Sequence, residues 1–514
     1  GEKAEGIFEK RYGYDPVTGN SAMPAPKDPG NGEGFKYSDL VSYANAMDQL
    51  SGQEIEENRF ASFYGALDYS LFDRYVLNVS FRTDGSNNFG SDEQFNPTWS
   101  AGAVWHVSEE TFMEVVRPVL SRLSLRVATG YTGNINKTVK PNLMMKYYKN
   151  FRISDDENYR MGYINNAPNP KLRWEKTRDV KVALDFGLWK DRINGIVEAY
   201  WRKSKDCVTS EYVPVTTGFF NQSYNTSVLQ NNGVEFSLSV AVLKSKDYNL
   251  SVSANVAWNQ NKLKKYNSPN TSLALDKYVG YPMGAVFSGK YEGIDPETGM
   301  YKFKLRPDAV TNKDGYLREP NNYYYYLGTS VAPFTGGFNL NFSYKNIGLS
   351  VGGSYSVKAK MVDNIESPAG YELLSGSKLE SIPTPHNDLY RNHLNVKREV
   401  RNRWTPENRT GVKYPRLIDA YGKKLGLDLT NPTLTTITRG ALLEDISYLR
   451  INTIALSYSL PQRVLERINF SSAALNLTLN NFFTITKYSG IDPEVPGATY
   501  PVSRSVTIGL NVGF

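Results

Sequence analysis

The C-terminal stretch SRSVTIGLNVGF (Ser503–Phe514) decides how the rest of the sequence is interpreted, because its side chains alternate strictly in polarity. The apolar side chains occupy the even positions, which are Val506, Ile508, Leu510 and Val512. The small or polar side chains occupy the odd positions, which are Ser505, Thr507, Gly509 and Asn511. Successive side chains of a β-strand point to opposite faces of its sheet. The stretch therefore predicts a strand with one apolar and one wet face, ending on the bare aromatic Phe514.

The same alternation recurs along most of the chain. It is clear, for example, between Leu250 and Trp258, where apolar residues occupy every second position. Counting such segments gives about thirteen long strands, which start near residues 58, 74, 96, 121, 174, 193, 233, 248, 334, 346, 442, 470 and 501. No segment of comparable length has the apolar spacing of a helix. The sequence therefore predicts an all-β fold.

The connections between these strands differ in length in a regular way. Short or moderate ones are Leu71–Arg74, 108–120, Lys190–Ile193, Lys244–Asp247, Lys345–Gly348 and 461–469. Long ones cover roughly 134–171, 208–232, 264–333 and 361–440. Short turns at one end of an antiparallel sheet and long loops at the other are typical of an outer-membrane barrel. We therefore expect a transmembrane antiparallel β-barrel, with the apolar parity toward lipid and the polar parity toward the lumen.

The composition argues against several other classes of protein. The 514 residues contain 36 Tyr and 23 Phe, a single cysteine (Cys207) and three histidines, and the formal net charge is +7. One cysteine cannot form an internal disulfide, and no Cys/His cluster has the spacing of a zinc site. The modest charge, without a long basic run, argues against nucleic-acid binding. The sequence contains no run of about 18 apolar residues, so it predicts no transmembrane helix.

No catalytic or cofactor-binding motif is present. The sequence lacks HExxH, a P-loop and GxSxG. A secreted glycan hydrolase, which is one rival interpretation, needs two carboxylates about 5 to 10 Å apart in a cleft. Nothing in the sequence pairs its acids in this way. We therefore expect no enzymatic activity, no cofactor and no bound metal.

The odd number of strands has a consequence for the N-terminal segment. Bacterial single-chain barrels normally have an even number of strands. If the last strand runs toward the periplasm, the first one does too, and residues 1–57 are then an extracellular loop segment, rich in Pro and Gly. Residues 58–514 form the barrel portion, which we expect to be completed by strands that this chain lacks.

Several local motifs resemble one family, the SusC/RagA-type TonB-dependent transporters. They occur in family order from about residue 58 to the end: RTDGSNNFG (Arg82–Gly90), Pro97–Trp105, LSLRVATGYTGN (Leu123–Asn134), NPKLRWEKT (Asn169–Thr177), RWTPEN (Arg403–Asn408) followed by YPRL, SYLRINTIALSYSLP (Ser447–Pro461) and NNFFTITKYSGIDPEV (Asn480–Val495). The resemblance implies a 22-stranded barrel behind an N-terminal plug. This chain would supply about the thirteen C-terminal strands, without the plug.

The resemblance also implies a function and a set of partners. Such transporters sit in the bacterial outer membrane and import oligomeric nutrients, more often glycans than oligopeptides. Energy arrives from TonB through the plug, which the missing N-terminal segment would carry. A SusD-like lipoprotein covers the extracellular opening, and such pairs can form dimers. The barrel-insertion machinery would recognise Phe514 as an assembly signal, and lipid would contact the apolar parity. The alternative is a non-transporting barrel used for adhesion or ligand binding.

Two groups of aromatic residues are candidate contact sites. Tyr323, Tyr324, Tyr325 and Tyr326 lie in the sequence NNYYYYLG within a long loop. Aromatic rings stack on sugars or cover peptide side chains, although an aromatic hairpin that packs on neighbouring loops or on the lid explains the same residues. Trp404 lies where extracellular loops of the family meet the lipoprotein. We favour a structural or partner-contact role for it over substrate contact.

The last long loop carries Tyr488, a further candidate for substrate or partner contact. Asp492 and Glu494 follow it and raise the question of a cation site. Two carboxylates beside a proline turn are more often solvated or capping groups, so we do not predict a metal there. DPETG (Asp295–Gly299) and NKDG (Asn312–Gly315) also lack the full ligand set of a calcium loop, and turn chemistry explains them better.

Overall fold

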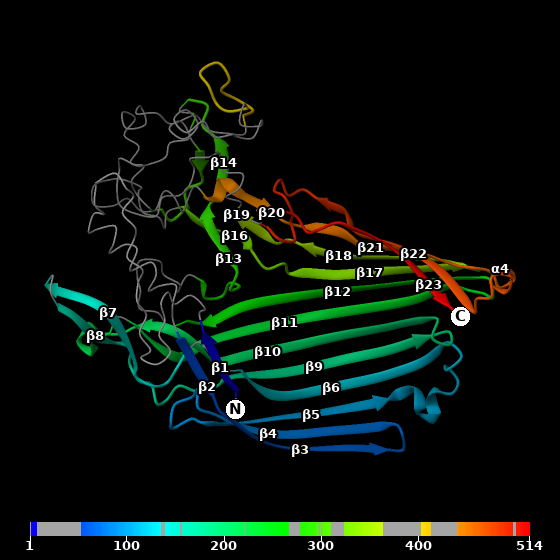
Figure 1. Cartoon of the computed structure of the whole chain (residues 1–514), viewed down its shortest axis with the longest axis horizontal. Coiled ribbons are helices and arrows are strands. Elements are labelled where there is room, and N and C mark those ends of the chain that lie inside the picture. Colours follow the sequence, from blue (N-terminus) through cyan, green and yellow to red (C-terminus); the bar gives the residue numbers. More distant parts are fainter. Residues whose placement is uncertain are drawn as a thin grey trace, which may run out of the picture.

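A computed structural model shows that one large antiparallel sheet dominates the molecule (Figure 1). The structure describes residues 2–7, 53–134, 139–154, 157–219, 221–266, 278–297, 299, 301–309, 323–362, 402–412, 439–496 and 500–514. The sheet has thirteen strands. Strands that are neighbours in the sheet also follow one another along the chain, apart from the small strands in the loops between them. The predicted count of thirteen is therefore confirmed.

The thirteen strands form the strand wall of the molecule. In sheet order they are β3 (Phe60–Leu71), β4 (Tyr75–Ser86), β5 (Phe95–His106), β6 (Leu120–Asn134), β9 (Glu175–Leu188), β10 (Ile193–Tyr212), β11 (Asn221–Lys244), β12 (Tyr248–Lys265), β17 (Phe334–Tyr344), β18 (Ile347–Val357), β21 (Tyr448–Ser459), β22 (Ser472–Thr486) and β23 (Ser505–Gly513). Strands β3 and β23 are the two edges, and the sheet between them is curved (Figure 1).

Smaller strand pairs lie within the long connections or, for the first pair, before the strand wall begins. They are β1 (Glu2–Ile7) with β2 (Gln53–Asn58), β7 (Met144–Ser154) with β8 (Glu157–Asn166), β13 (Ala285–Gly289) with β16 (Tyr324–Thr329), β14 (Tyr291–Ile294) with β15 (Tyr301–Phe303), and β19 (Lys360–Val362) with β20 (Leu443–Asp445). The pair of β1 and β2 lies in and just after residues 1–57, the segment predicted to be an extracellular loop. The remainder of that segment lies outside the described residues.

Among the residues that the structure describes, helical structure is limited to short pieces. They are α4 (Gln462–Arg467) and single 3-10 turns at Val107–Glu109, Thr111–Met113, Val215–Thr217 and Arg439–Leu442. Within the described part of the chain, no helix is long and apolar enough to cross a membrane.

Short turns and long loops lie at opposite ends of the sheet, as predicted. Figure 1 places the short turns, α4 and the C-terminus at one end, and the small strand pairs toward the other. Phe72, Asp73 and Lys345, in two of the short turns, have φ of 53°, 55° and 48°. This left-handed backbone matches the right-handed twist of the two strands that such a hairpin turn joins.

One predicted long loop, 208–232, is wrong. Strand β10 continues to Tyr212 and β11 begins at Asn221, so the connection covers only residues 213–220. The two strands remain paired along this extension, with bulges around Cys207. The extension was missed because residues such as Gln230, Asn231 and Asn232 are polar on both parities. Cys207 thus lies within β10.

The two faces of the strand wall differ as the alternation predicted. Apolar side chains of one parity are exposed also on interior strands, for instance Leu184 of β9 at 38% and Leu456 of β21 at 44%. No protein layer covers this face in the described chain, which is expected when the apolar side of a barrel contacts lipid. Well-buried side chains instead gather mostly in the loops, where Tyr488 packs with Ala359 and Ile446.

Candidate functional site

The polar face of the strand wall has a charged half, formed by the polar parity of β3 to β11. Three ion pairs link neighbouring strands there, namely Arg126–Asp185 (2.6 Å), Arg202–Asp179 (3.0 Å) and Lys181–Glu198 (3.2 Å). The guanidinium of Arg126 donates to both carboxylate oxygens of Asp185, which is the strong bidentate geometry. The opposite charges of each pair therefore lie in direct contact across neighbouring strands.

The polar parity of β12 to β23 forms a neutral half. Between Asn249 and Asn261, and on β17, β18, β22 and β23, this parity carries mainly Asn, Ser, Thr, Gly and Ala. Side-chain hydrogen bonds connect the strands, such as Ser350 Oγ to Asn341 Oδ1 at 2.8 Å and Asn480 Nδ2 to Ser505 Oγ at 3.0 Å. The small side chains leave an open hollow of about 420 Å3 that extends from β12 to β22. This half offers donors and acceptors that exchange readily with a hydroxyl- or amide-rich ligand.

At the long-loop end, two motifs far apart in sequence form one packed cluster. The rings of Phe89 and Trp174 stack with centroids 4.5 Å apart, and Gly90 donates its backbone N–H to Leu172 at 2.9 Å. A Cβ at Gly90 would lie 1.8 Å from the carbonyl oxygen of Pro170, so only glycine fits there. The motifs RTDGSNNFG and NPKLRWEKT therefore build a common support for the loops.

Arg173 ties this cluster to the extended hairpin of β10 and β11. Its Nη2 contacts Asp206 Oδ1 at 2.7 Å, and this hydrogen bond raises the pKa of Arg173. The side-chain amide of Asn225 donates to the carbonyls of both Arg173 and Asp206 at 2.7 Å. Residues 167–174 thus lie across the hairpin as a fixed strap.

Arg450 is the centre of a second support at this end. It is 2% exposed and forms an ion pair with Asp492, and its Nη1 lies 3.1 Å from Glu494 Oε2. Burial works to raise the pKa of Asp492, but the backbone N–H groups of Glu494 and Val502 together with Arg450 lower it. The two carboxylates are therefore occupied by an arginine. No three His, Cys, Asp or Glu side chains are grouped for a metal ion among the residues that the structure describes.

The four consecutive tyrosines lie in and just before β16. Tyr323 precedes the strand, and Tyr324 to Tyr326 pair with β13. The Tyr326 ring is 41% exposed and packs 4.8 Å from that of Tyr281, while the hydroxyl of Tyr325 donates to the carbonyl of Leu305 at 2.9 Å. Burial raises the pKa of both Tyr323 and Tyr326.

Three further rings belong to this aromatic cluster and were not predicted from the sequence. Phe287 lies 4.8 Å from Tyr278 and 5.0 Å from Tyr281, between ring centroids. Backbone hydrogen bonds between Leu263 and residues 280–281 hold the cluster against the end of β12. All three rings come from the same long loop as the tyrosine run, but they have no strand periodicity that would have drawn attention to them.

The remaining candidates lie in contrasting environments. Trp404 is 7% exposed, and its indole N–H donates to the carbonyl of Pro296 at 3.0 Å. Tyr488 is 6% exposed. Phe514, in contrast, is 92% exposed at the short-turn end, where its ring packs edge-on against Phe470 at 5.3 Å. The structure therefore gathers the aromatic cluster and Trp404 with the long loops and leaves Phe514 at the opposite end of the sheet.

Comparison with known proteins agrees with this architecture. The family model described as "TonB dependent receptor-like, beta-barrel" matches residues 8–355. The chain belongs to this family.

Individual members of the family show the same relationship. The TonB-dependent receptor SusC of Bacteroides thetaiotaomicron is 27% identical over 488 residues, covering 89% of this chain and 44% of that protein. TonB-dependent receptor P26 of Formosa agariphila is 26% identical over 498 residues, covering 89% and 46%. The solved structure of the RagAB peptide transporter superposes with a TM-score of 0.71 at 26% identity, covering 90% and 48%. The chain spans just under half the length of these relatives.

Family membership gives the two faces and the two ends a physical meaning. The chain is part of a SusC/RagA-type barrel in the outer membrane, as the sequence motifs predicted. The apolar face therefore contacts lipid and the polar face lines the lumen. The long loops are extracellular and the short turns are periplasmic. The charged and neutral halves described above are then two parts of one lumen wall.

Proposed function

We propose that this chain takes part in TonB-dependent import of oligomeric nutrients, with glycan oligosaccharides as the first substrate class and oligopeptides as the second. The observation that carries the proposal is the neutral half of the lumen wall. Its amides and hydroxyls match the hydroxyls of a sugar chain, and its small side chains leave room along several strands. Oligopeptides remain the second candidate because the RagAB structure, at 26% identity, is that of a peptide transporter.

The lumen wall favours movement of a neutral oligomer over tight binding. Hydrogen bonds to Ser, Asn and Thr are modest in net strength, about 0.5–1.5 kcal/mol each. An oligomer that exchanges one such hydrogen bond for the next along the surface of β12 to β23 meets no deep energy minimum. In each ion pair of the charged half, the cation and the carboxylate already contact each other. No bond of the substrate needs to be broken.

Capture at the extracellular end belongs to the loops and to a SusD-like lipoprotein that closes over them. We propose that the exposed Tyr326, with Tyr323 to Tyr325 beside it, contacts the substrate or this lid. Trp404 and Tyr488 are buried in the chain itself, so we propose that they shape the loops that the lid meets. A ligand closes such a lid only if it binds the closed state more tightly than the open state.

An uptake experiment on the full-length protein in its own membrane tests this function. Cells with and without the gene would receive fluorescent oligosaccharides and oligopeptides, each with and without an uncoupler that removes the energy supplied through TonB. Energy-dependent entry that is lost with the gene supports import and identifies the class. Surface binding that is insensitive to the uncoupler, without entry, would instead establish the adhesion alternative.

The proposed partners can be tested by isolating the chain from solubilised outer membrane. We expect a plug-bearing N-terminal segment and a SusD-like lipoprotein to co-purify with it, in a dimer of such pairs. The variants Tyr326→Ala and Tyr248→Ala make a matched comparison, because Tyr248 has a similar exposure of 43% but lies at the short-turn end of β12. Only Tyr326→Ala should weaken capture of substrate or lid.

A further inference from the structure

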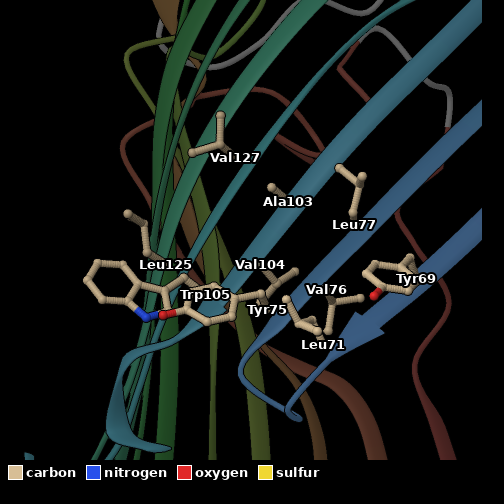
Figure 2. A pocket seen from close by; sticks show the side chains of 10 residues that line it. All are labelled: Tyr69, Leu71, Tyr75, Val76, Leu77, Ala103, Val104, Trp105, Leu125 and Val127. Carbon is tan, nitrogen blue, oxygen red and sulfur yellow. The ribbon is translucent and has the colours of Figure 1, made fainter. Parts of the chain in front are cut away.

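The lipid-facing side of the strand wall carries a groove that none of the functions above uses. It crosses β3 to β6 near their periplasmic ends and has a volume of about 280 Å3. Its floor is Ala103, which is in register with Leu77 on one side and Val127 on the other. Figure 2 shows the small Ala103 side chain between these two larger ones. A short side chain in a row of long ones creates the hollow.

Two aromatic rings close the periplasmic end of the groove. Tyr75 and Trp105 are in register with each other. They are the next pair on the same face of the sheet, two residues along each strand from Leu77 and Ala103. Figure 2 shows the phenol oxygen and the indole nitrogen close together, on the side of the rings away from Ala103. Such rings are enriched where the membrane meets water. The groove therefore begins at the interface and extends into the hydrocarbon region.

Glu110 fixes the orientation of these rings. Its Oε1 accepts hydrogen bonds from the Tyr75 hydroxyl at 2.5 Å and from the Trp105 indole N–H at 3.1 Å, and its Oε2 accepts from Arg74 at 3.2 Å. The bond from Tyr75 is the main reason why the pKa of Glu110 is lowered, so the carboxylate stays ionised. The rings are thus held as a rigid end wall.

Charges of both signs lie in the turn that follows β5 and carries Glu110. Arg74 keeps 36% of its side chain exposed while bound to Glu110. Arg117 and Glu109 form a second pair, at 3.4 Å, with exposures of 41% and 54%. A headgroup that itself carries one positive and one negative charge would be complemented here, its phosphate by the exposed part of Arg74 and its ammonium by Glu109.

We propose that this groove binds one acyl chain of a zwitterionic phospholipid from the periplasmic leaflet, with the headgroup at Arg74 and Glu109. The periplasmic end of the strands places the site in the inner leaflet of the outer membrane. An apolar hollow, a rigid aromatic end wall and a mixed-charge entrance together match one amphiphile better than they match a general lipid surface. The site rests on family membership and orientation, and not on import.

Native mass spectrometry of the full-length protein, reconstituted with phosphatidylethanolamine or phosphatidylglycerol, tests the proposal. Ala103→Leu fills the groove, and Ala101→Leu is the matched control, because Ala101 lies on the same face of β5 but does not line the groove. We expect one retained phosphatidylethanolamine in the wild type and in Ala101→Leu. In Ala103→Leu its occupancy should fall about tenfold, as expected if about two methylene groups lose their contacts.

A charge variant tests the headgroup separately. Glu109→Gln should reduce the preference for phosphatidylethanolamine over phosphatidylglycerol, because it removes the partner of the ammonium. Equal lipid retention in Ala103→Leu and Ala101→Leu, or no preference between the two lipids in the wild type, would overturn the proposal. Uptake assayed in parallel separates the two ideas, because loss of the lipid with normal uptake leaves the proposed function intact.

Discussion

The strand wall and the long-loop end of the same chain are stabilised in different ways. In the strand wall, apolar side chains on interior strands, such as Leu456, are 44% exposed, and backbone pairing connects the strands. At the long-loop end, Leu172 and Arg450 are each 2% exposed and Trp174 is 6% exposed. The apolar side chains of the wall contact membrane lipid, whereas the loops are surrounded by water and bury apolar side chains against one another. The same substitution therefore has different consequences in the two regions.

The largest expected effect is the loss of Arg450 from the long-loop end. Arg450→Met leaves the carboxylate of Asp492 buried without its cation, which typically costs about 3–5 kcal/mol. Lys181→Met, in the lumen wall, removes a single-contact pair whose lysine is 40% exposed, and such pairs contribute only about 0.2–1 kcal/mol. Urea unfolding of the purified protein in detergent measures both. Similar losses for the two variants would contradict the distinction between the regions.

Removal of the stacked indole should have an effect of similar size. Trp174→Ala opens a cavity beside Phe89 and should cost about 3–5 kcal/mol. Ile508→Ala, in the wall, should cost clearly less, because lipid can fill the space that the shortened side chain leaves. Unfolding in lipid vesicles, together with limited proteolysis near residues 167–174, reports on each region. A cost for Ile508→Ala as large as that for Trp174→Ala would show that the wall packs like a protein core.

Charge placed on opposite parities of one strand should distinguish the two faces of the wall. Leu510→Arg puts a cation into lipid and should cost roughly 2–4 kcal/mol near the membrane midplane. Asn511→Arg puts it into the wet lumen and should be tolerated better. Val256→Arg and Asn255→Arg repeat the comparison on β12. The amount of heat-resistant folded barrel in the outer membrane is the readout, and equal tolerance on both parities would refute the assignment of faces.

The smallest effect concerns acid. The pKa of Asp492 is lower in the folded protein than in the unfolded chain, so the unfolded chain binds the proton more readily. Its contribution to stability is therefore complete above the ordinary carboxyl pKa and is lost as pH falls through the lowered value. Proteolysis of the segment around residues 487–496 should accelerate in this acidic range. Asp492→Asn should abolish most of that pH dependence, and an unchanged profile would show that other groups control the loop.

Local pattern was sufficient to predict the strand wall. A strand that separates lipid from a wet lumen must alternate at every second residue, so the signal is present in each short window, as in Val506 to Val512. Loop lengths follow directly from the gaps between such windows. The prediction failed between residues 208 and 232, because that hairpin extends beyond its neighbours and is polar on both faces, so alternation disappears there.

The candidate site was predictable only in part. The tyrosine run stood out in sequence, but its neighbours Tyr281 and Phe287 did not, because they lie much earlier in the same loop. The pairing of β13 with β16 brings them beside Tyr326. Arg450 had one visible signal, as the single charged residue in the strand sequence YLRINTIALSYS. Its partners lie about forty residues later, within a motif that by itself resembled an acidic turn.

The sequence by itself determined the strand count, the alternation of faces, the sorting of short and long connections and the family, since each depends on residues close together in the chain. Only the tertiary structure decided which distant residues meet: Phe89 with Trp174, Arg450 with Asp492, and Ala103 between Leu77 and Val127. The physical reason is that the face on which each side chain of a strand lies follows from its position in the two-residue repeat. A buried contact depends instead on how closely the intervening loops allow two distant segments to approach.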